Sequence, residues 1–215
     1  MMMLDAPTLV MVDMQRYYLE SSSPFARFHS SVDPGCLSYI RERAETIVIP
    51  NCARLIESFR KADYQVTYLR LCGREMDRSD LQHTFRKVHR DAEKVGFHDL
   101  YPLQSDPYSD VISALAPPEH ENEFCKTTYS AFTSAPEFER FLAEHGSRTL
   151  VFAGLATSQC VETTARDAAD RDYQIIHVED AQADYSETMH RASLYSSQGV
   201  CGGQIVDTDA LLERL

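Results

Sequence analysis

The stretch VFAGLATSQCVETTARDAADRDY (151–173) decides the fold of this chain. It opens with a short apolar run, which is typical of a strand buried on both faces of a parallel sheet. Gly154 ends this run, and alanines then recur on one face of the following segment, as in a helix that lies close to a sheet. Thr157 and Ser158 are candidate N-caps of that helix. The stretch therefore predicts a strand, a turn and a helix, with Cys160 in the first helical turn.

The same alternation continues through the rest of the chain. Further apolar runs, each short and rich in β-branched or aromatic residues, occupy residues 8–12, 66–71, 149–153, 173–178 and, more weakly, 204–206. Apolar residues at helical spacing occupy residues 49–62, 136–145, 160–172 and 186–199. Alternating strands and helices with right-handed crossovers predict an α/β fold.

Two segments do not fit this alternation. Residues 21–38 form an expected long loop near the start, and residues 73–108 are rich in charge and contain several histidines. Loops of this length in a compact domain usually serve as functional lids or as oligomer contacts. We therefore expect one of these two roles for each segment.

Length, composition and charge narrow the class of protein. The 215 residues, with a formal net charge of −12, fit a single domain over residues 1–215. The negative charge disfavours a nucleic-acid groove. No apolar run reaches the ~18 residues of a membrane span, and no basic region precedes the first apolar run, so we expect a cytoplasmic protein.

The six cysteines form no CxxC or CxxH pair, which argues against a structural zinc site. A chain of this length needs no disulfide bridge to hold its fold. At least one cysteine could be a nucleophile, and we expect the others to be passive, small, buried apolar residues.

Three residues could carry chemistry, although each also has a purely structural interpretation. Asp13 follows an apolar strand and is either a loop or cap residue or a general base. Cys160 is either a buried structural residue or a thiol whose pKa the helix N-terminus lowers. Lys126 is either a surface lysine or a buried one with a partner. Because neighbouring residues of an extended segment face opposite ways, Cys125 cannot share a site with Lys126.

Four pieces of the sequence together resemble a known family. They are LVMVDMQRYY (9–18), FCKTTYSAF (124–132), the stretch 151–173 and VEDAQADYSETMHRASL (178–194). On these pieces, in this order, the chain resembles the isochorismatase-like cysteine hydrolases, which include nicotinamidases, N-carbamoylsarcosine amidases, ureidoacrylate amidohydrolases and biuret hydrolases. The resemblance implies a three-layer, doubly wound, mostly parallel six-stranded sheet with helices on both faces.

The resemblance also implies a catalytic triad of Asp13, Lys126 and Cys160. In this scheme Asp13 takes the thiol proton, Lys126 favours the thiolate, and Cys160 attacks an amide or ureido carbonyl to form a thioester. It further implies a cis peptide bond between Leu155 and Ala156, with the N–H groups of Ala156 and Cys160 as the oxyanion hole. Members of the family usually form homodimers or tetramers, and residues 21–38 are our candidate contact.

Cys160 also indicates the kind of reaction. Isochorismatases proper lack this cysteine and cleave a vinyl ether, whereas members that keep it look like amidohydrolases. Nicotinamidases carry a metal site built from an Asp and two His after the second strand, but YLRLCGREMDRSDL (68–81) has no histidine. We therefore expect no metal and no cofactor, and a small amide, ureido or N-carbamoyl substrate.

The candidate substrate-binding residues lie near the triad in sequence, and each could instead be a packing residue. Tyr18, Tyr129 and Phe132 could wall a pocket for a small planar amide. Gln15 could hold Asp13 or line the site. Two further candidates are Gln198, as a reader of the amide, and Arg70, as a partner for a substrate carboxylate. Two buried histidines, His177 and His190, are expected to be structural.

Three alternatives stay open at this point. The chain could be a nicotinamidase-like hydrolase, or a non-catalytic α/β binding or oligomerisation module that keeps the fold. It could also be a thiol redox protein, although no second cysteine lies near Cys160 in the sequence.

Overall fold

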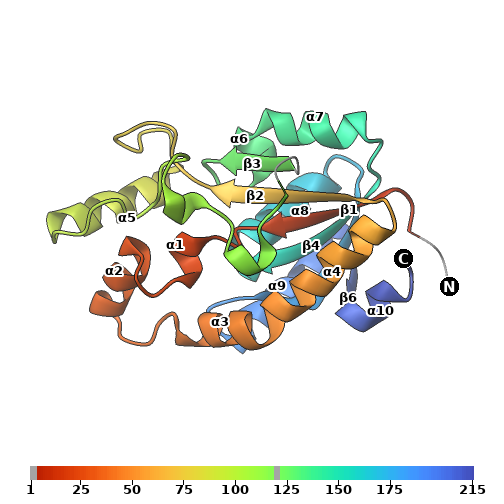
Figure 1. The fold of residues 1–215 in the computed structure, drawn as a ribbon, viewed down its shortest axis with the longest axis horizontal. Helices are drawn as coiled ribbons and strands as arrows, with labels where there is room; N and C mark the ends of the chain where they lie inside the picture. The colour runs from red at the N-terminus through yellow and green to blue at the C-terminus, as the bar shows by residue number, and fades with distance from the viewer. Residues whose placement is uncertain (1–3, 119–121) are drawn as a thin grey trace.

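A six-stranded parallel sheet forms the centre of the molecule (Figure 1). The computed structural model describes residues 4–118 and 122–215. The strands are β1 (Pro7–Val12), β2 (Gln65–Leu71), β3 (Asn122–Lys126), β4 (Thr149–Leu155), β5 (Gln174–Ala183) and β6 (Gln204–Val206). They lie in the order β3-β2-β1-β4-β5-β6, and every pairing is parallel. The predicted α/β fold class is confirmed.

Helices cover both faces of this sheet. The longer ones are α2 (Pro24–Val32), α4 (Ile49–Lys61), α5 (His83–Lys94), α7 (Pro136–Glu144), α8 (Glu162–Ala169) and α9 (Glu187–Cys201). The shorter ones are α1 (Arg16–Leu19), α3 (Ser38–Arg43), α6 (Ala131–Ser134) and α10 (Thr208–Leu212). Within the described residues, no helix is both long and apolar enough to cross a membrane.

The alternation of side chains along β1 explains the layers. Leu9 and Met11 point into a core shared with α4 and α10, whereas Val10 and Val12 point into a second core shared with α6, α7 and α8. All six residues of β1 are buried, because the strand lies in the middle of the sheet with helices on both sides.

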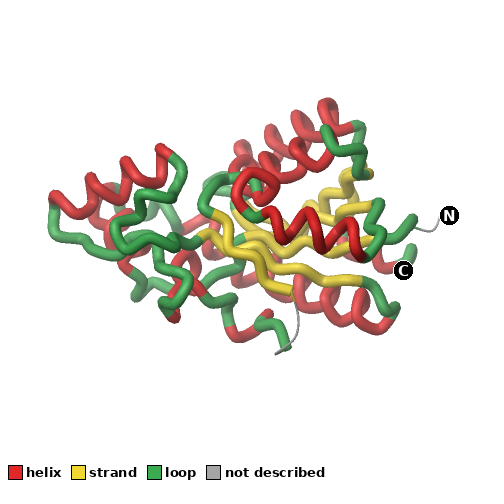
Figure 2. Tube along the Cα trace, turned by 90° about the horizontal axis from the view of Figure 1, so that it is seen from above, coloured by secondary structure: helices red, strands yellow, loops and turns green. Residues whose placement is uncertain are grey.

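Both segments that were predicted to be long loops contain a helix. Residues 21–38 include α2, whose N-cap Ser23 accepts a hydrogen bond from the Ala26 N–H and is followed by proline at the first helical position. Residues 73–108 include α5. In Figures 1 and 2 these helices lie beyond the end of the sheet to which the arrowheads of β1 and β2 point. This end bears the carboxyl ends of the strands, where ligands bind in open α/β sheets.

A buried histidine lies in the second core. The Nε2 atom of His177 on β5 lies 2.9 Å from the Ser197 hydroxyl on α9, and its Nδ1 atom lies 3.3 Å from the Gln182 amide nitrogen. Burial lowers the pKa of His177 to about 4. The side chain is therefore neutral at pH 7 and acts as a structural link between β5 and α9.

This histidine should make the protein less stable in mild acid. Between pH 6.5 and 4 the unfolded chain binds a proton at His177 and the folded chain does not, so the free energy of unfolding falls as the pH falls through this range. The loss attributable to His177 is about 3 kcal/mol at its full extent. Urea unfolding of the parent and of His177→Asn across this range measures it. The variant should lose less stability, whereas the exposed control His98→Asn should follow the parent; identical slopes for all three would contradict the assignment.

Candidate active site

The first candidate residue, Asp13, lies in a constrained turn directly after β1. Its φ angle of 49° falls in the left-handed region, which Asp tolerates better than most residues. Its Oδ1 accepts a hydrogen bond from the Leu71 N–H at 3.1 Å, and its own N–H donates to the Leu69 carbonyl at 2.9 Å. The end of β2 thus fixes both the backbone and the carboxylate of Asp13.

Gln15 completes this turn. Its Oε1 accepts from the Leu71 N–H at 2.8 Å, and its Nε2 donates to the carbonyl oxygens of Leu71 (3.1 Å) and Ser109 (2.8 Å). Both ends of the side chain are therefore engaged with backbone groups, and Gln15 does not line the cavity beside Cys160. Of its two predicted roles, the structure favours support of the Asp13 turn.

The second candidate, Lys126, joins the other two. It is the last residue of β3 and is fully buried. Its ammonium group donates to Asp13 Oδ2 at 2.9 Å, to the Cys160 sulfur at 3.2 Å and to the Thr128 carbonyl at 3.3 Å. These three acceptors match the three N–H groups of a lysine. Lys126 therefore bridges Asp13 and Cys160 with no proton left for another partner.

The third candidate, Cys160, lies in a tight turn after β4. The chain leaves β4 through a cis peptide bond between Leu155 and Ala156, at the position that the family resemblance implies. Gly154 is required just before it, because a Cβ atom there would overlap the backbone of Val12 on β1. A π-helical turn (Thr157–Val161) then leads into α8, so the backbone is wound more widely around Cys160 than in an α-helix.

The cap of this turn differs from the prediction. The N-cap residue is Ala156, and neither Thr157 nor Ser158 caps the helix with its side chain. Thr157 instead pairs with His190 of α9 at 2.8 Å, and the Ser158 N–H donates to the buried carboxylate of Asp184. The sequence analysis missed Asp184, although it follows β5 as Asp13 follows β1. An acidic side chain therefore already occupies the helix N-terminus.

The pKa of the Cys160 thiol differs from the expectation. Burial raises the pKa of the Cys160 thiol, the Asp13 carboxylate raises it further, and Lys126 opposes these effects only in part. Burial alone would lower the pKa of Lys126, but the charges of Asp13 and Cys160 raise it. Lys126 favours the thiolate, as predicted, but burial and Asp13 outweigh it, so the prediction that this thiol loses its proton more readily than a free cysteine is wrong for the free protein. The cysteine sulfur thus lies beside a buried Lys126–Asp13 ion pair, with 2.9 Å between the charged atoms.

A small, mostly aromatic cavity opens onto Asp13 and Cys160. It has an empty volume of about 340 Å³, which includes space open to solvent. Its aromatic walls are Tyr17, Tyr18, Phe25, Phe85, Tyr101 and Tyr185. Phe25 belongs to the segment 21–38, and Phe85 and Tyr101 belong to the segment 73–108. The two segments that the sequence could not place therefore build much of the cavity wall.

The predicted substrate-binding residues divide between the cavity and other parts of the structure. Tyr18 lines the cavity. Tyr129 is half-buried behind Phe85, with ring centroids 4.5 Å apart. Phe132 lies in the second core, under the guanidinium of Arg171, and Gln198 lies on an exposed face of α9 that lines a separate groove. Phe132 and Gln198 therefore do not line this cavity, because their helices point them elsewhere.

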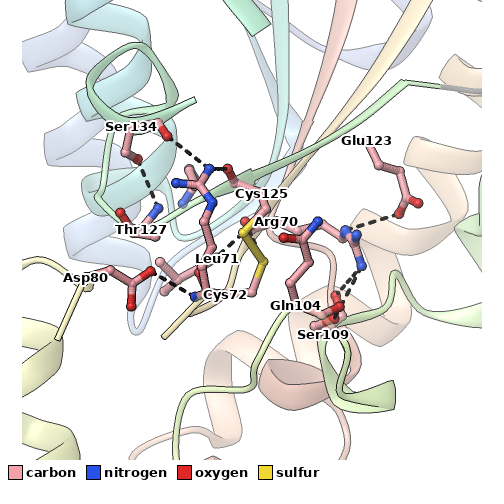
Figure 3. The surroundings of a disulfide bond; sticks show 12 residues. Arg70, Leu71, Cys72, Asp80, Gln104, Ser109, Glu123, Cys125, Thr127 and Ser134 are labelled. Carbon is pink, nitrogen blue, oxygen red and sulfur yellow. Dashed lines mark hydrogen bonds and ion pairs between the residues drawn. A yellow bond between two sulfur atoms is a disulfide. The ribbon is translucent and has the colours of Figure 1, made fainter. Parts of the chain in front are cut away.

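Arg70 does not line the cavity, and its side chain points toward Glu123 and Ser109 (Figure 3). Its guanidinium lies 3.2 Å from Glu123 and 3.3 Å from the Ser109 hydroxyl. In the register of the sheet Arg70 is opposite Cys125, and Leu71 is opposite Lys126. Because side chains alternate along a strand, Arg70 shares the face of Cys125 and not the face of the triad. The prediction that it meets a substrate carboxylate is not supported by this placement.

Figure 3 also shows a disulfide bond between Cys72 and Cys125. It links the residue after β2 to the residue before Lys126, with 6.0 Å between the Cα atoms. The even cysteine count was only weak evidence for a bridge, and these two cysteines were predicted to be passive, whereas the structure pairs them. The sequence predicted that Cys125 and Lys126 point to opposite sides, and the separate contacts of the two side chains agree.

Potential metal ligands do not gather elsewhere. In the two described ranges, 4–118 and 122–215, no three His, Cys, Asp or Glu side chains lie close enough together to hold a metal ion.

Most of the cavity-wall aromatics were missed by sequence reasoning. Only the neighbours of Asp13, Tyr17 and Tyr18, carried a signal, namely their position directly after the first strand.

Comparison with known proteins identifies the family. The Isochorismatase domain matches residues 7–210, which is nearly the whole chain. This chain belongs to the isochorismatase family. Over 197 residues it is 26% identical to the ureidoacrylate amidohydrolase RutB of Variovorax paradoxus, a match that covers 90% of this chain and 75% of that protein.

Of two further matches, the first covers only part of each protein and the second shows only a common fold. The chain is 39% identical to RutB of Methylobacterium radiotolerans over 85 residues, which are 39% of this chain but only 33% of that relative. Among solved structures, the cysteine hydrolase from Pseudomonas syringae pv. phaseolicola superposes with a TM-score of 0.78 at 24% identity, covering 100% of this chain and 95% of that one. At this identity the superposition establishes a common fold.

Proposed function

We propose that this family member is a cysteine-dependent amidohydrolase that cleaves a C–N bond of a small amide, ureido or N-carbamoyl compound. The observation that carries the proposal is the position of the Lys126 ammonium group, which lies within 3.2 Å of both the Asp13 carboxylate and the Cys160 sulfur beside a small cavity. The amidohydrolase relatives, matched over most of the chain, support the same reaction class.

The first half of the reaction forms a thioester. As the Cys160 sulfur bonds to the carbonyl carbon, its proton passes to Asp13, which Lys126 and the Leu71 N–H hold in place. The carbonyl oxygen gains negative charge, and the backbone N–H groups of Ala156 and Cys160 are the proposed donors to it. The C–N bond then breaks, and the proton held by Asp13 leaves with ammonia or the amine.

The second half restores the enzyme. A water molecule loses a proton to Asp13 and attacks the thioester carbon, so that the C–S bond breaks, the acid is released and the Cys160 sulfur regains a proton. The raised pKa of the thiol fits this cycle. A bare thiolate is unfavourable in this site, so the sulfur leaves the thioester readily only if it takes up a proton as it departs. Asp13 therefore relays one proton in each half: the thiol proton to the departing amine, and then a proton of water to the departing sulfur.

That residues 1–215 act as one domain stays a prediction; the family match spans residues 7–210 of it. Assembly into a homo-oligomer through residues 21–38 and a cytoplasmic location stay predictions. The position of Phe25 in the cavity wall gives this segment a role in the site as well.

A covalent intermediate tests the proposed function directly. Wild-type protein is mixed with nicotinamide, biuret, ureidoacrylate, N-carbamoyl amino acids and simple aliphatic and aromatic amides, and ammonia is measured. Reactions with any active compound are quenched in acid within one turnover, and peptides are weighed by mass spectrometry. We expect the acyl group of the substrate on Cys160. Turnover of a substrate with no acyl group on this cysteine at any quench time would contradict the thioester mechanism.

A further inference from the structure

We infer that the substrate of this site is a small, uncharged amide with an apolar or aromatic body, and that the site excludes compounds that carry a carboxylate. The inference rests on the proposed function, because it describes the substrate class of the same cavity. It narrows that function, since ureido and N-carbamoyl compounds include both charged and uncharged members.

The first argument is the composition of the walls. Six aromatic rings surround the cavity, together with apolar Leu71 and Leu155 and the amide side chain of Gln159. None of the cavity-lining residues in the described part of the chain is an arginine or a lysine. The charged side chain that does line it, Asp13, is negative and would repel an anion. A carboxylate in this cavity would therefore be desolvated without a partner, which is strongly unfavourable.

The second argument is that the nearby cations are already engaged. Lys126 directs its three N–H groups to Asp13, Cys160 and Thr128. The guanidinium of Arg70 faces Glu123 (Figure 3). Arg78, which is buried, bonds the Asp99 carboxylate at 2.9 Å and the Tyr101 carbonyl at 2.9 Å. None of the three can turn to a substrate without leaving a buried or half-buried partner unpaired.

The third argument concerns the polar atoms that the walls do offer. Among the residues that the structure describes, the buried Tyr18 hydroxyl has no hydrogen-bond partner of normal geometry, although the Tyr185 hydroxyl lies near enough to influence its pKa. Burial raises the pKa of Tyr18 well above its usual value and that of Tyr185 to about 12, so both hydroxyls stay neutral. A phenol can pair with a carbonyl, hydroxyl or ring nitrogen of a neutral substrate. This uncharged donor is sufficient for a neutral ligand, whereas a carboxylate would also need a cation to offset its desolvation beside Asp13, and no lining residue in the described part of the chain supplies one.

Two alkylating reagents of nearly equal size test the charge preference without knowledge of the substrate. Iodoacetamide is neutral and iodoacetate is anionic; each forms a carbon–sulfur bond to Cys160, releases iodide and displaces the thiol proton. The alkylation rate of Cys160 is followed by peptide mass spectrometry and divided by the rate for a free thiol under the same conditions. We expect iodoacetamide to be favoured at least tenfold after this correction. Equal corrected rates, or faster reaction with iodoacetate, would overturn the inference.

A pair of variants tests whether the wall charge is the cause. Phe85→Lys places a flexible cation at the cavity edge, and Phe85→Met is the uncharged control of similar length. Phe85→Lys should raise the corrected rate with iodoacetate about tenfold relative to Phe85→Met, with thermal unfolding confirming that both variants fold. No difference between two folded variants would show that something other than wall charge sets the preference. Failure of the lysine variant to fold would leave the wild-type ratio as the deciding result.

Matched amides separate this inference from the proposed function. Butyramide and succinamate differ mainly in that a carboxylate replaces the terminal methyl group. Where either is hydrolysed, kcat/KM should favour butyramide by at least about 100-fold, and a preference for succinamate would overturn the inference while supporting the amidohydrolase. If no amide is hydrolysed, the proposed function fails, and the alkylation rates still decide the charge preference of the cavity.

Discussion

Replacement of Cys160 by alanine is expected to lower kcat/KM for the active amide by roughly 10,000-fold or more. The sulfur is the atom that bonds to the carbonyl carbon in the proposed mechanism, and the remaining groups can at best orient water. The variant should fold normally, because the change removes one buried atom that accepts a single hydrogen bond from Lys126. Ammonia release at substrate concentrations well below KM measures the effect.

The matched control for this variant is Cys201→Ala. Cys201 is a half-buried free cysteine at the end of α9, outside the cavity. Its replacement should leave kcat/KM within about twofold of the parent. Cys160→Ala and Cys201→Ala should have similar thermal unfolding midpoints. If Cys160→Ala retained more than about 1% of the parental activity, the sulfur could not be the nucleophile.

Replacement of Lys126 by methionine should damage both stability and activity. The methionine fills most of the volume of the lysine but leaves the buried Asp13 carboxylate without its ion-pair partner. Breaking a buried pair by removing one partner costs about 3–5 kcal/mol of unfolding free energy. The same change removes the group that fixes Asp13 against Cys160, so kcat should fall about 1,000-fold. Urea unfolding and ammonia release measure the two effects.

The double variant Asp13→Asn/Lys126→Met separates these two effects. Neutralising Asp13 removes the unpaired charge, so the double variant should recover much of the stability that Lys126→Met loses. It should recover no activity, because the proposed proton acceptor is also gone. A double variant no more stable than Lys126→Met would show that the loss of stability comes from packing and not from the buried charge.

Sequence reasoning located all three residues of the triad, and for two of them the position follows from chain direction. Asp13 follows β1, Lys126 ends β3, and Cys160 follows β4. In a parallel sheet these strand ends meet at one edge, so short-range patterns were sufficient for Asp13 and Cys160. The strand β3 that carries Lys126 was not among the predicted strands, and the family resemblance supplied the place of this residue in the triad. The resemblance to known hydrolases then assigned their roles, which the structure makes geometrically reasonable and the experiments above test.

The cavity walls could not be predicted in the same way. Phe25, Phe85 and Tyr101 come from segments whose helices pack beyond the sheet, and nothing in their local sequence specifies which helix face meets the triad. The position of Arg70 relative to the site could not be predicted from the sequence either. Its distance from the site depends on the pairing register of β2 with β3, which sets the face of the sheet on which it lies.

By itself, the stretch 151–173 determined the strand, the turn and the helix that carry Cys160, because glycine, alanine and apolar periodicity act over a few residues. The tertiary structure decided the state of the thiol. Burial and the nearby Asp13 carboxylate raise its pKa, whereas the helix N-terminus, which the sequence suggested as the activating group, is occupied by Asp184. Desolvation and the approach of distant charges depend on the packed fold as a whole, and no local pattern specifies them.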